Sequence, residues 1–130
     1  MNSGNFPYLI RQRTGCANPL GVVKFGMNSP FDVYLHDTPG KVAFEGKNRY
    51  YSHGCVRLED AIGLAQAILP GKVDKQFLKA CFSDQQPQVL PVQEPVPVFI
   101  VYMMAEVDDA GKVIYHKDVY ELGEKGGNDY

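Results

Sequence analysis

The residues best suited to chemistry lie in the stretch "YLHDTPGKVAFEGKNRYYSHGCVR", from Tyr34 to Arg57. Two histidines and one cysteine flank a long polar segment there. A cysteine in such a setting can act as a nucleophile, bind a metal, form a disulfide or serve as a small buried side chain. The surrounding residues have to discriminate among these four roles for Cys55.

The neighbours of Cys55 favour a reactive thiolate. The cysteine lies just before a predicted helix that begins near Leu58, with Gly54 on one side and Arg57 on the other. The helix dipole and the guanidinium both stabilise a negative sulfur at this place. Because Gly54 lacks a Cβ, the backbone can turn tightly and direct its N–H groups toward an oxygen bound beside the sulfur. The pattern therefore favours a nucleophile with an oxyanion site.

A cysteine nucleophile needs a general base, and His36 and His53 are the candidates. His53 is two residues from Cys55, so in an extended segment its side chain points to the same side and can shape the oxyanion site or contact substrate. His36 ends a predicted strand and can approach Cys55 from a neighbouring strand. The backbone carbonyl of Asp37 could then orient the imidazole of His36. On these residues alone, a structural role for the pair stays open.

The chain has three cysteines, Cys16, Cys55 and Cys81, so one stays unpaired whatever bridge forms. No two of them have the short spacing of a zinc knuckle, and no metal site is expected. A redox interpretation predicts a Cys16–Cys81 bridge, whereas the helical pattern around Cys81 predicts a buried core thiol. Both alternatives stay open.

The composition suits one compact domain, because the 130 residues are 45% hydrophobic and carry a formal net charge of −2. Basic and acidic residues are interspersed, which argues against binding to nucleic acid or to an anionic membrane surface. No apolar run is long enough to span a membrane, and "MNSGNFPYLI" lacks the pattern of a signal peptide. We therefore expect a soluble chain, which is compatible with a mature or excised piece of an exported protein.

Most of the chain is expected to be β. The segment "FDVYLHD" (31–37) alternates apolar with polar or aromatic residues, as a strand with one face inward does. The near-continuous apolar run "VPVFIVYMMAEV" (96–107) is typical of a central strand. The stretch "DDAGK" then predicts a hairpin into "VIYHKDVYEL", in which Gly111 supplies the positive φ.

Two segments that follow Cys55 have helical patterns instead. The segment 58–69 has acidic residues in its first turn and places four apolar residues on one stripe: Leu58, Ile62, Ala65 and Leu69. The segment 73–82 predicts a second short helix with a buried face: Val73, Phe77, Ala80 and Cys81. The proline-rich segment 83–97 is expected to lie extended over the surface.

The segment from His36 to Arg57 resembles the motif of the L,D-transpeptidase (YkuD-like) catalytic domain: a histidine, a spacer, then Ser/Thr-His-Gly-Cys, an apolar residue and Asn or Arg. The spacer here runs from Asp37 to Tyr51, and "SHGCVR" follows it. The resemblance to the larger periplasmic members of the family covers about residues 18–120. It implies a mostly β fold, a YkuD-like sandwich or sheet with two short helices after the catalytic cysteine. The expected domain is a single one over residues 1–130, truncated at its N-terminus, because such members carry further strands ahead of the matched part.

The resemblance implies an enzyme of peptidoglycan synthesis that acts in cell wall biogenesis and cell shape. In the family, the cysteine attacks the third residue of a tetrapeptide stem, expels D-alanine and forms a thioester that an amine of another stem resolves to a 3-3 cross-link. The implied partners are peptidoglycan stem peptides, with carbapenem β-lactams as inhibitors, and no cofactor is implied. The implied location is the bacterial periplasm or cell envelope. The alternatives are an L,D-carboxypeptidase, in which water resolves the thioester, and a non-catalytic murein-binding fragment.

Carried over by position, four residues form the catalytic group. Cys55 is the nucleophile, and His36 is the proton acceptor and donor. His53 holds the oxyanion together with the backbone N–H groups of Gly54 and Cys55.

Three further positions are implied for substrate binding and its support. Arg57 suits a carboxylate of the stem peptide because its guanidinium is a planar fork of donors. Ser52 supports the loop. Tyr51 belongs to a flap, 40–51, whose aromatic residues Phe44, Tyr50 and Tyr51 either shield the acyl-enzyme from water or anchor the loop.

Overall fold

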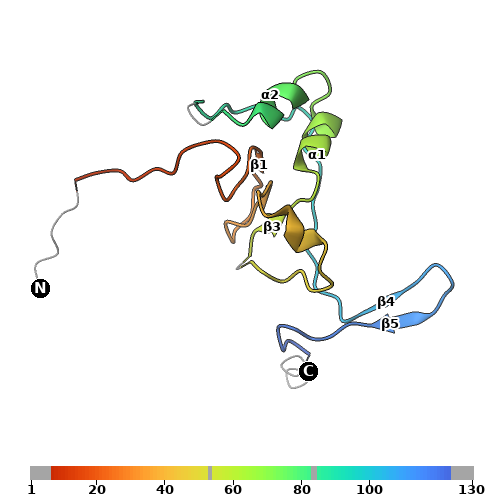
Figure 1. Ribbon diagram of the computed structural model, residues 1–130. Coiled ribbons are helices and arrows are strands. Elements are labelled where there is room, and N and C mark those ends of the chain that lie inside the picture. The colour runs from red at the N-terminus through yellow and green to blue at the C-terminus, as the bar shows by residue number, and fades with distance from the viewer. Residues whose placement is uncertain (1–6, 53, 83–84, 124–130) are drawn as a thin grey trace, which may run out of the picture. The chain divides into compact units, whose positions relative to one another are not determined.

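The computed structural model of the protein describes residues 7–52, 54–82 and 85–123. The chain divides into two compact units, Met1–Gln93 and Glu94–Tyr130. The first unit contains a three-stranded sheet and two helices, and the second contains a two-stranded hairpin (Figure 1). The assignment of the whole chain to one catalytic domain stays a prediction.

The sheet of the first unit consists of three two-residue strands, β1 (Lys24–Phe25), β2 (Leu35–His36) and β3 (Val56–Arg57). Strand β2 lies in the middle, antiparallel to β1 and parallel to β3. The strand predicted over 31–37 is thus only two residues long. Its expected inward apolar face is wrong, because Phe31 is 82% exposed whereas His36 is buried. The buried residues at the end of the central strand are polar: His36, Asp37 and Thr38.

Helix α1 (Ala61–Ile68) confirms the first predicted helix, although it begins three residues later than expected. Asp60 caps its N-terminus, where the side-chain Oδ1 accepts a hydrogen bond from the Gly63 N–H at 2.9 Å. Ala61 and Ala65 are buried, and so is Leu69 just beyond the helix. This apolar stripe forms the small hydrophobic core among the described residues.

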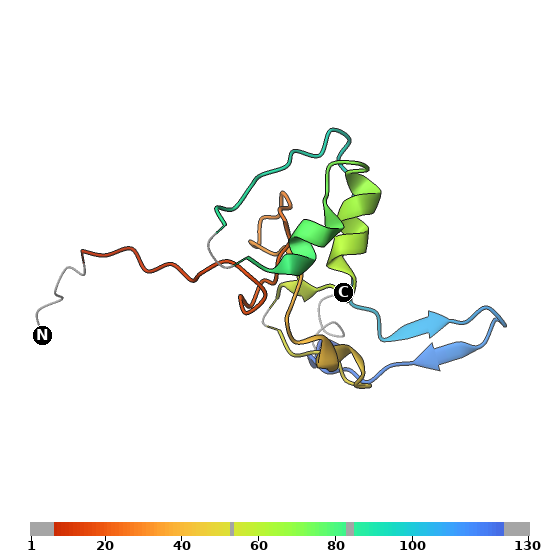
Figure 2. The ribbon, with the colours of Figure 1, turned by 45° about the horizontal axis from the view of Figure 1, so that its top comes forward.

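Helix α2 (Lys75–Ala80) lies beside α1, as Figure 2 shows. Asp74 caps it by accepting hydrogen bonds from the N–H groups of Gln76 and Phe77. The predicted buried face is wrong, because α2 contains no buried residue and Phe77 is 43% exposed. The predicted core thiol of Cys81 is wrong as well, because Cys81 forms a disulfide with Cys16. A covalent link to the N-terminal segment takes the place of apolar packing.

The second unit confirms the predicted hairpin. Strands β4 (Ala105–Val107) and β5 (Val113–Tyr115) pair antiparallel, with Val107 opposite Val113. Gly111 in the connecting loop has φ +79°, as expected. Asp108 organises the loop by accepting hydrogen bonds from the N–H groups of Ala110 and Lys112.

The central strand predicted over 96–107 is wrong for its larger part. Only Ala105–Val107 is a strand, and residues such as Phe99 (84% exposed) and Val101 (67%) lie open to solvent. A strand needs a neighbour to pair its backbone groups, and no described segment pairs with residues 96–103. At Met104, the carbonyl oxygen accepts a hydrogen bond from the His116 N–H at 2.8 Å, next to the paired strands. The described residues 85–97 of the proline-rich connection are exposed and free of helix and strand, as expected.

Two short helices follow Cys55 as the family resemblance implies, whereas the expected β-sandwich is not confirmed. Among the described residues, no helix is both long and apolar enough to cross a membrane.

Candidate active site

The register of β2 and β3 brings the predicted base and nucleophile to one face of the sheet. Leu35 pairs with Val56 and His36 pairs with Arg57, so the residue before Val56, Cys55, is level with Tyr34. Side chains alternate along a strand, and paired residues of parallel strands point to the same face. His36 and Cys55 are therefore diagonal neighbours. The strand spacing and the rise over two residues place their Cα atoms roughly 8 Å apart.

The imidazole of His36 is buried and is held by the backbone of the next residue, Asp37. His36 is 5% exposed, and its Nδ1 lies within hydrogen-bond distance of the Asp37 carbonyl oxygen. A carbonyl oxygen only accepts, so Nδ1 is the donor and Nε2 remains able to accept a proton. The contact expected for the Asp37 carbonyl is thus present.

The side chain of Asp37 points away from the imidazole into a separate set of donors. Its Oδ2 accepts from the Val22 N–H at 3.0 Å, and its Oδ1 forms an ion pair with the Lys41 Nζ at 2.8 Å. Burial by itself raises the pKa of this carboxyl. The hydrogen bonds from Lys41, Val22 and Thr38 outweigh burial and hold the pKa below its ordinary value. Asp37 is therefore an ionised anchor at the end of β2.

Tyr34 lies on the same face as His36 and Cys55, the predicted base and nucleophile. Its ring meets the His36 ring edge-on, with centroids 5.9 Å apart, and the Lys24 Nζ lies 3.9 Å above it. A hydrogen bond with Cys55 and the charge of that residue raise the pKa of the Tyr34 phenol. Tyr34 therefore contacts Cys55 through its hydroxyl group and His36 through its ring.

In the loop before β3, the side chain of Ser52 contacts the backbone of Cys55. The Ser52 Oγ donates to the Cys55 carbonyl oxygen at 2.7 Å. Gly54 has φ +152°, a backbone conformation that favours glycine. Cys55 is half-buried and is the free cysteine of the chain. His53 lies outside the described residues.

Two cavities lie on either side of this loop. One, of about 260 Å³, is lined by Cys55, Gly54 and Ser52 together with three residues of the segment before β2: Phe31, Asp32 and Val33. The other, of about 440 Å³, is open to solvent and is lined by Arg57 and by residues of the predicted flap, including Tyr51. Of the three residues predicted for substrate binding, Arg57 and Tyr51 line this cavity and Ser52 lines the other one.

The flap contains a short 3-10 helix, η1 (Lys41–Phe44). Arg49 ties its end back by donating to the Phe44 carbonyl oxygen at 2.8 Å. Tyr50 and Tyr51 stack on each other and are 47% and 58% exposed. These two exposed rings do not anchor the loop by burial, and shielding of an acyl-enzyme stays a prediction.

Two site residues were not among the predicted ones, Tyr34 and Lys41. The alternation of Tyr34 with His36 along one strand could have indicated the first. Nothing in the sequence marks Lys41, because its partners come from segments that only the fold brings together. In the described part of the chain, no group of three or more His, Cys, Asp or Glu side chains could hold a metal ion.

A free thiol on the same sheet face as an imidazole that is fixed through Nδ1 suits cysteine-dependent acyl transfer. The chain belongs to the YkuD family, since the model of the L,D-transpeptidase catalytic domain matches its residues 1–98. The resemblance read from the motif is thereby confirmed. A protein of Haemophilus influenzae (strain ATCC 51907 / DSM 11121 / KW20 / Rd), named "Putative L,D-transpeptidase", is 35% identical over 116 residues, which make up 88% of this chain and 23% of that protein. The chain thus spans less than a quarter of the length of this relative.

Proposed function

We propose that this YkuD domain is an L,D-transpeptidase that transfers acyl groups between peptidoglycan stem peptides through a thioester on Cys55. The observation that carries the proposal is the parallel pairing of β2 with β3, which brings His36 and Cys55 to one face. The Asp37 carbonyl adds the second requirement, because it leaves the Nε2 of His36 free to accept a proton.

In the first half-reaction, Nε2 of His36 takes the thiol proton while the sulfur attacks the carbonyl carbon of the third stem residue. The N–H groups of Gly54 and Cys55, with His53 by its place in the motif, stabilise the oxyanion. The C–N bond to D-alanine then breaks, and His36 returns the proton to the leaving amine. A side-chain amine of a second stem attacks the thioester, loses its proton through His36 and releases the thiol, which completes a 3-3 cross-link.

The cavity around Arg57 and Tyr51 supplies a place for the stem peptide. Arg57 is exposed on the same face as His36, so its guanidinium can bind a stem carboxylate with two parallel hydrogen bonds. Ser52 holds the Cys55 carbonyl and keeps the loop in place.

The periplasm or cell envelope is the proposed location, and the Cys16–Cys81 disulfide supports it. Disulfides persist in oxidising compartments and are rare in reducing ones. Fractionation of cells that produce the whole protein tests this: recovery in the periplasmic or envelope fraction is expected, and recovery with cytosolic markers would contradict it.

Intact-protein mass spectrometry after incubation with a carbapenem tests the nucleophile. Since Cys16 and Cys81 are bonded to each other, one adduct is expected, on Cys55. Cys55→Ala should give none, whereas Lys72→Met, at an exposed position outside the proposed site, is the control and should still be acylated. An adduct on Cys55→Ala would refute the assignment.

The products of incubation with a disaccharide tetrapeptide distinguish the reactions. A dimeric stem with loss of D-alanine supports the transpeptidase. A tripeptide with added water points to the carboxypeptidase. Wall binding that survives Cys55→Ser, without any adduct in the parent protein, points to a murein-binding module.

A further inference from the structure

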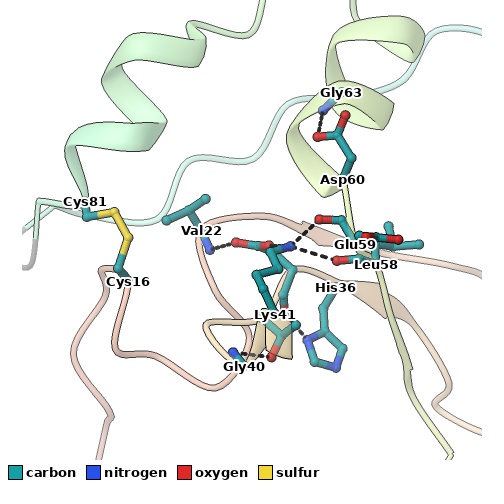
Figure 3. A network of polar contacts seen from close by, with 12 residues as sticks. Cys16, Val22, His36, Gly40, Lys41, Leu58, Glu59, Asp60, Gly63 and Cys81 are labelled. Carbon is teal, nitrogen blue, oxygen red and sulfur yellow. Dashed lines mark hydrogen bonds and ion pairs between the residues drawn. A yellow bond between two sulfur atoms is a disulfide. The ribbon is translucent and has the colours of Figure 1, made fainter. Parts of the chain in front are cut away.

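Lys41 lies at the junction of three segments that surround the catalytic pair. Its Nζ donates to Asp37 Oδ1 at 2.8 Å, to the Leu58 carbonyl oxygen at 2.9 Å and to the Glu59 carbonyl oxygen. Figure 3 shows the Lys41 ammonium joined by dashed lines to the carbonyl oxygens of Leu58 and Glu59. An ammonium has three N–H groups, and three acceptors meet it here. Lys41 thus joins the end of β2, the start of the flap and the segment that leads into α1.

The same junction is closed by the backbone of the catalytic strands. The Leu58 N–H donates to the His36 carbonyl oxygen at 2.8 Å, while the Leu58 carbonyl accepts from Lys41. Leu58 directly follows β3, the strand that Cys55 precedes. His36 therefore binds the N–H of Leu58 and Lys41 binds its carbonyl group. Together they hold the backbone of the segment that carries Cys55.

Both the backbone N–H and the side-chain carboxylate of Asp37 are held by hydrogen bonds. Its N–H donates to the Val23 carbonyl oxygen at 2.8 Å, and its carboxylate accepts from Val22 and Lys41. Gly21 leaves the space for this carboxylate, because a Cβ at Gly21 would lie 2.2 Å from Asp37 Oδ2. With its N–H and carboxylate both held, the Asp37 carbonyl has little freedom to turn away from the His36 Nδ1.

We propose that Lys41 is a positioning residue for His36, acting through Asp37. By holding the Asp37 carboxylate, Lys41 keeps the Asp37 carbonyl directed at Nδ1, which selects the tautomer with a proton on Nδ1 and a free Nε2. By holding the Leu58 and Glu59 carbonyls, it keeps β3, and with it Cys55, in register with His36. The catalytic consequence rests on the proposed function, whereas the tautomer does not.

A purely structural role for Lys41 makes a different prediction. The side chain of Lys41 is 45% exposed, and ion pairs of exposed lysines contribute little to the free energy of unfolding. If stabilisation were its whole role, replacing Lys41 would change the melting temperature slightly and leave the His36 ring unaffected. The state of the imidazole therefore separates the two roles.

The test uses the 130-residue chain with ¹⁵N-labelled histidine. Long-range ¹H–¹⁵N NMR spectra report the tautomer of each ring, and His36→Asn assigns the His36 signals. The variants are Lys41→Met, which removes the charge and the donors, and Lys41→Arg. Arginine keeps the charge, but its planar guanidinium cannot direct three N–H groups from a single nitrogen to three acceptors. Lys47→Met, at an exposed position of the same loop, is the control.

The parent protein and Lys47→Met should show the tautomer with Nδ1 protonated, and Lys41→Met a mixture of both. Carbapenem acylation of Lys41→Met should slow by about ten- to a hundredfold, the range expected for a misplaced catalytic group. Lys41→Arg should lie between. If Lys41→Met does not fold, the ring shifts and acylation rate of Lys41→Arg decide.

Ring shifts like those of the parent in a folded Lys41→Met would overturn the proposal, as would an unchanged acylation rate in a protein whose parent is acylated. If the parent itself forms no adduct, the proposed function fails. The ring shifts then still decide whether Lys41 positions His36.

Discussion

Removal of the Cys16–Cys81 disulfide is expected to destabilise the first unit by about 4 kcal/mol. The bridge closes a loop with a sequence separation of 65 residues. For a loop of that length, the chain-entropy relation gives an unfolded-state entropy loss of about 14 cal/mol/K, or about 4 kcal/mol at 25 °C. A small domain has a total of roughly 5–15 kcal/mol. The bridge is therefore comparable to the whole stability.

The composition of the core makes this loss severe. Among the described residues, the buried apolar side chains are Ala61, Ala65 and Leu69. Two alanines and one leucine bury little area, so apolar burial stabilises this unit only weakly. Small cores of this kind depend on a covalent link.

Urea unfolding followed by far-UV circular dichroism measures the effect. With a slope of about 1 kcal/mol/M, a loss of 4 kcal/mol lowers the midpoint by about 4 M. The reduced protein and the double variant Cys16→Ser/Cys81→Ser should both unfold at far lower urea than the oxidised protein. Cys55→Ser keeps the bridge and is the control. Equal midpoints for the oxidised and reduced protein would refute the reasoning, as would three titratable thiols in the unfolded oxidised chain.

Three further outcomes are expected. Gly21→Ala should lower the free energy of unfolding by about 1–3 kcal/mol, because the φ of Gly21 is +59° and a Cβ there would collide with Asp37. Gly26→Ala is the control, since a Cβ at Gly26 would meet open space, and it should lower the free energy of unfolding much less. Thermal unfolding measures both. The lowered pKa of Asp37 means that its stabilising effect is present above its ordinary value of 3.8 and is lost as the pH falls through the folded value. The difference in unfolding free energy between the parent and Asp37→Asn should therefore be constant from about pH 5 to 7 and shrink below about pH 4; a difference independent of pH contradicts this. Cys55→Ala should shift the pKa of Tyr34 down toward its ordinary value, because the hydrogen bond and charge of Cys55 raise it; ultraviolet titration against Tyr34→Phe measures the shift, and an unchanged value rejects the contact.

Local patterns predicted the parts of the fold that local interactions make. The hairpin around Gly111 depends on a turn of a few residues, and helix α1 depends on an N-cap and one apolar stripe. The hairpin and the presence of α1 were predicted correctly, whereas α1 begins three residues later than predicted, and Asp60, expected in its first turn, is its N-cap. The strand over 96–104 was not, because a strand forms only when another segment pairs with it, and hydrophobicity alone does not supply that neighbour. The buried face of α2 failed for a similar reason, since packing depends on what lies opposite.

The motif residues determined, by type and spacing, the family and the candidates Cys55 and His36. A thiol, an imidazole and a glycine are needed whatever the fold does, so the sequence alone could indicate them. Only the tertiary structure decided how the segments that carry the imidazole and the thiol lie against each other. The parallel register of β2 and β3, the contacts of Lys41 with the Leu58 and Glu59 carbonyl oxygens, and the choice of Cys81 as partner of Cys16 all join residues far apart in the chain. Such contacts depend on the relative placement of whole segments, which no local pattern encodes.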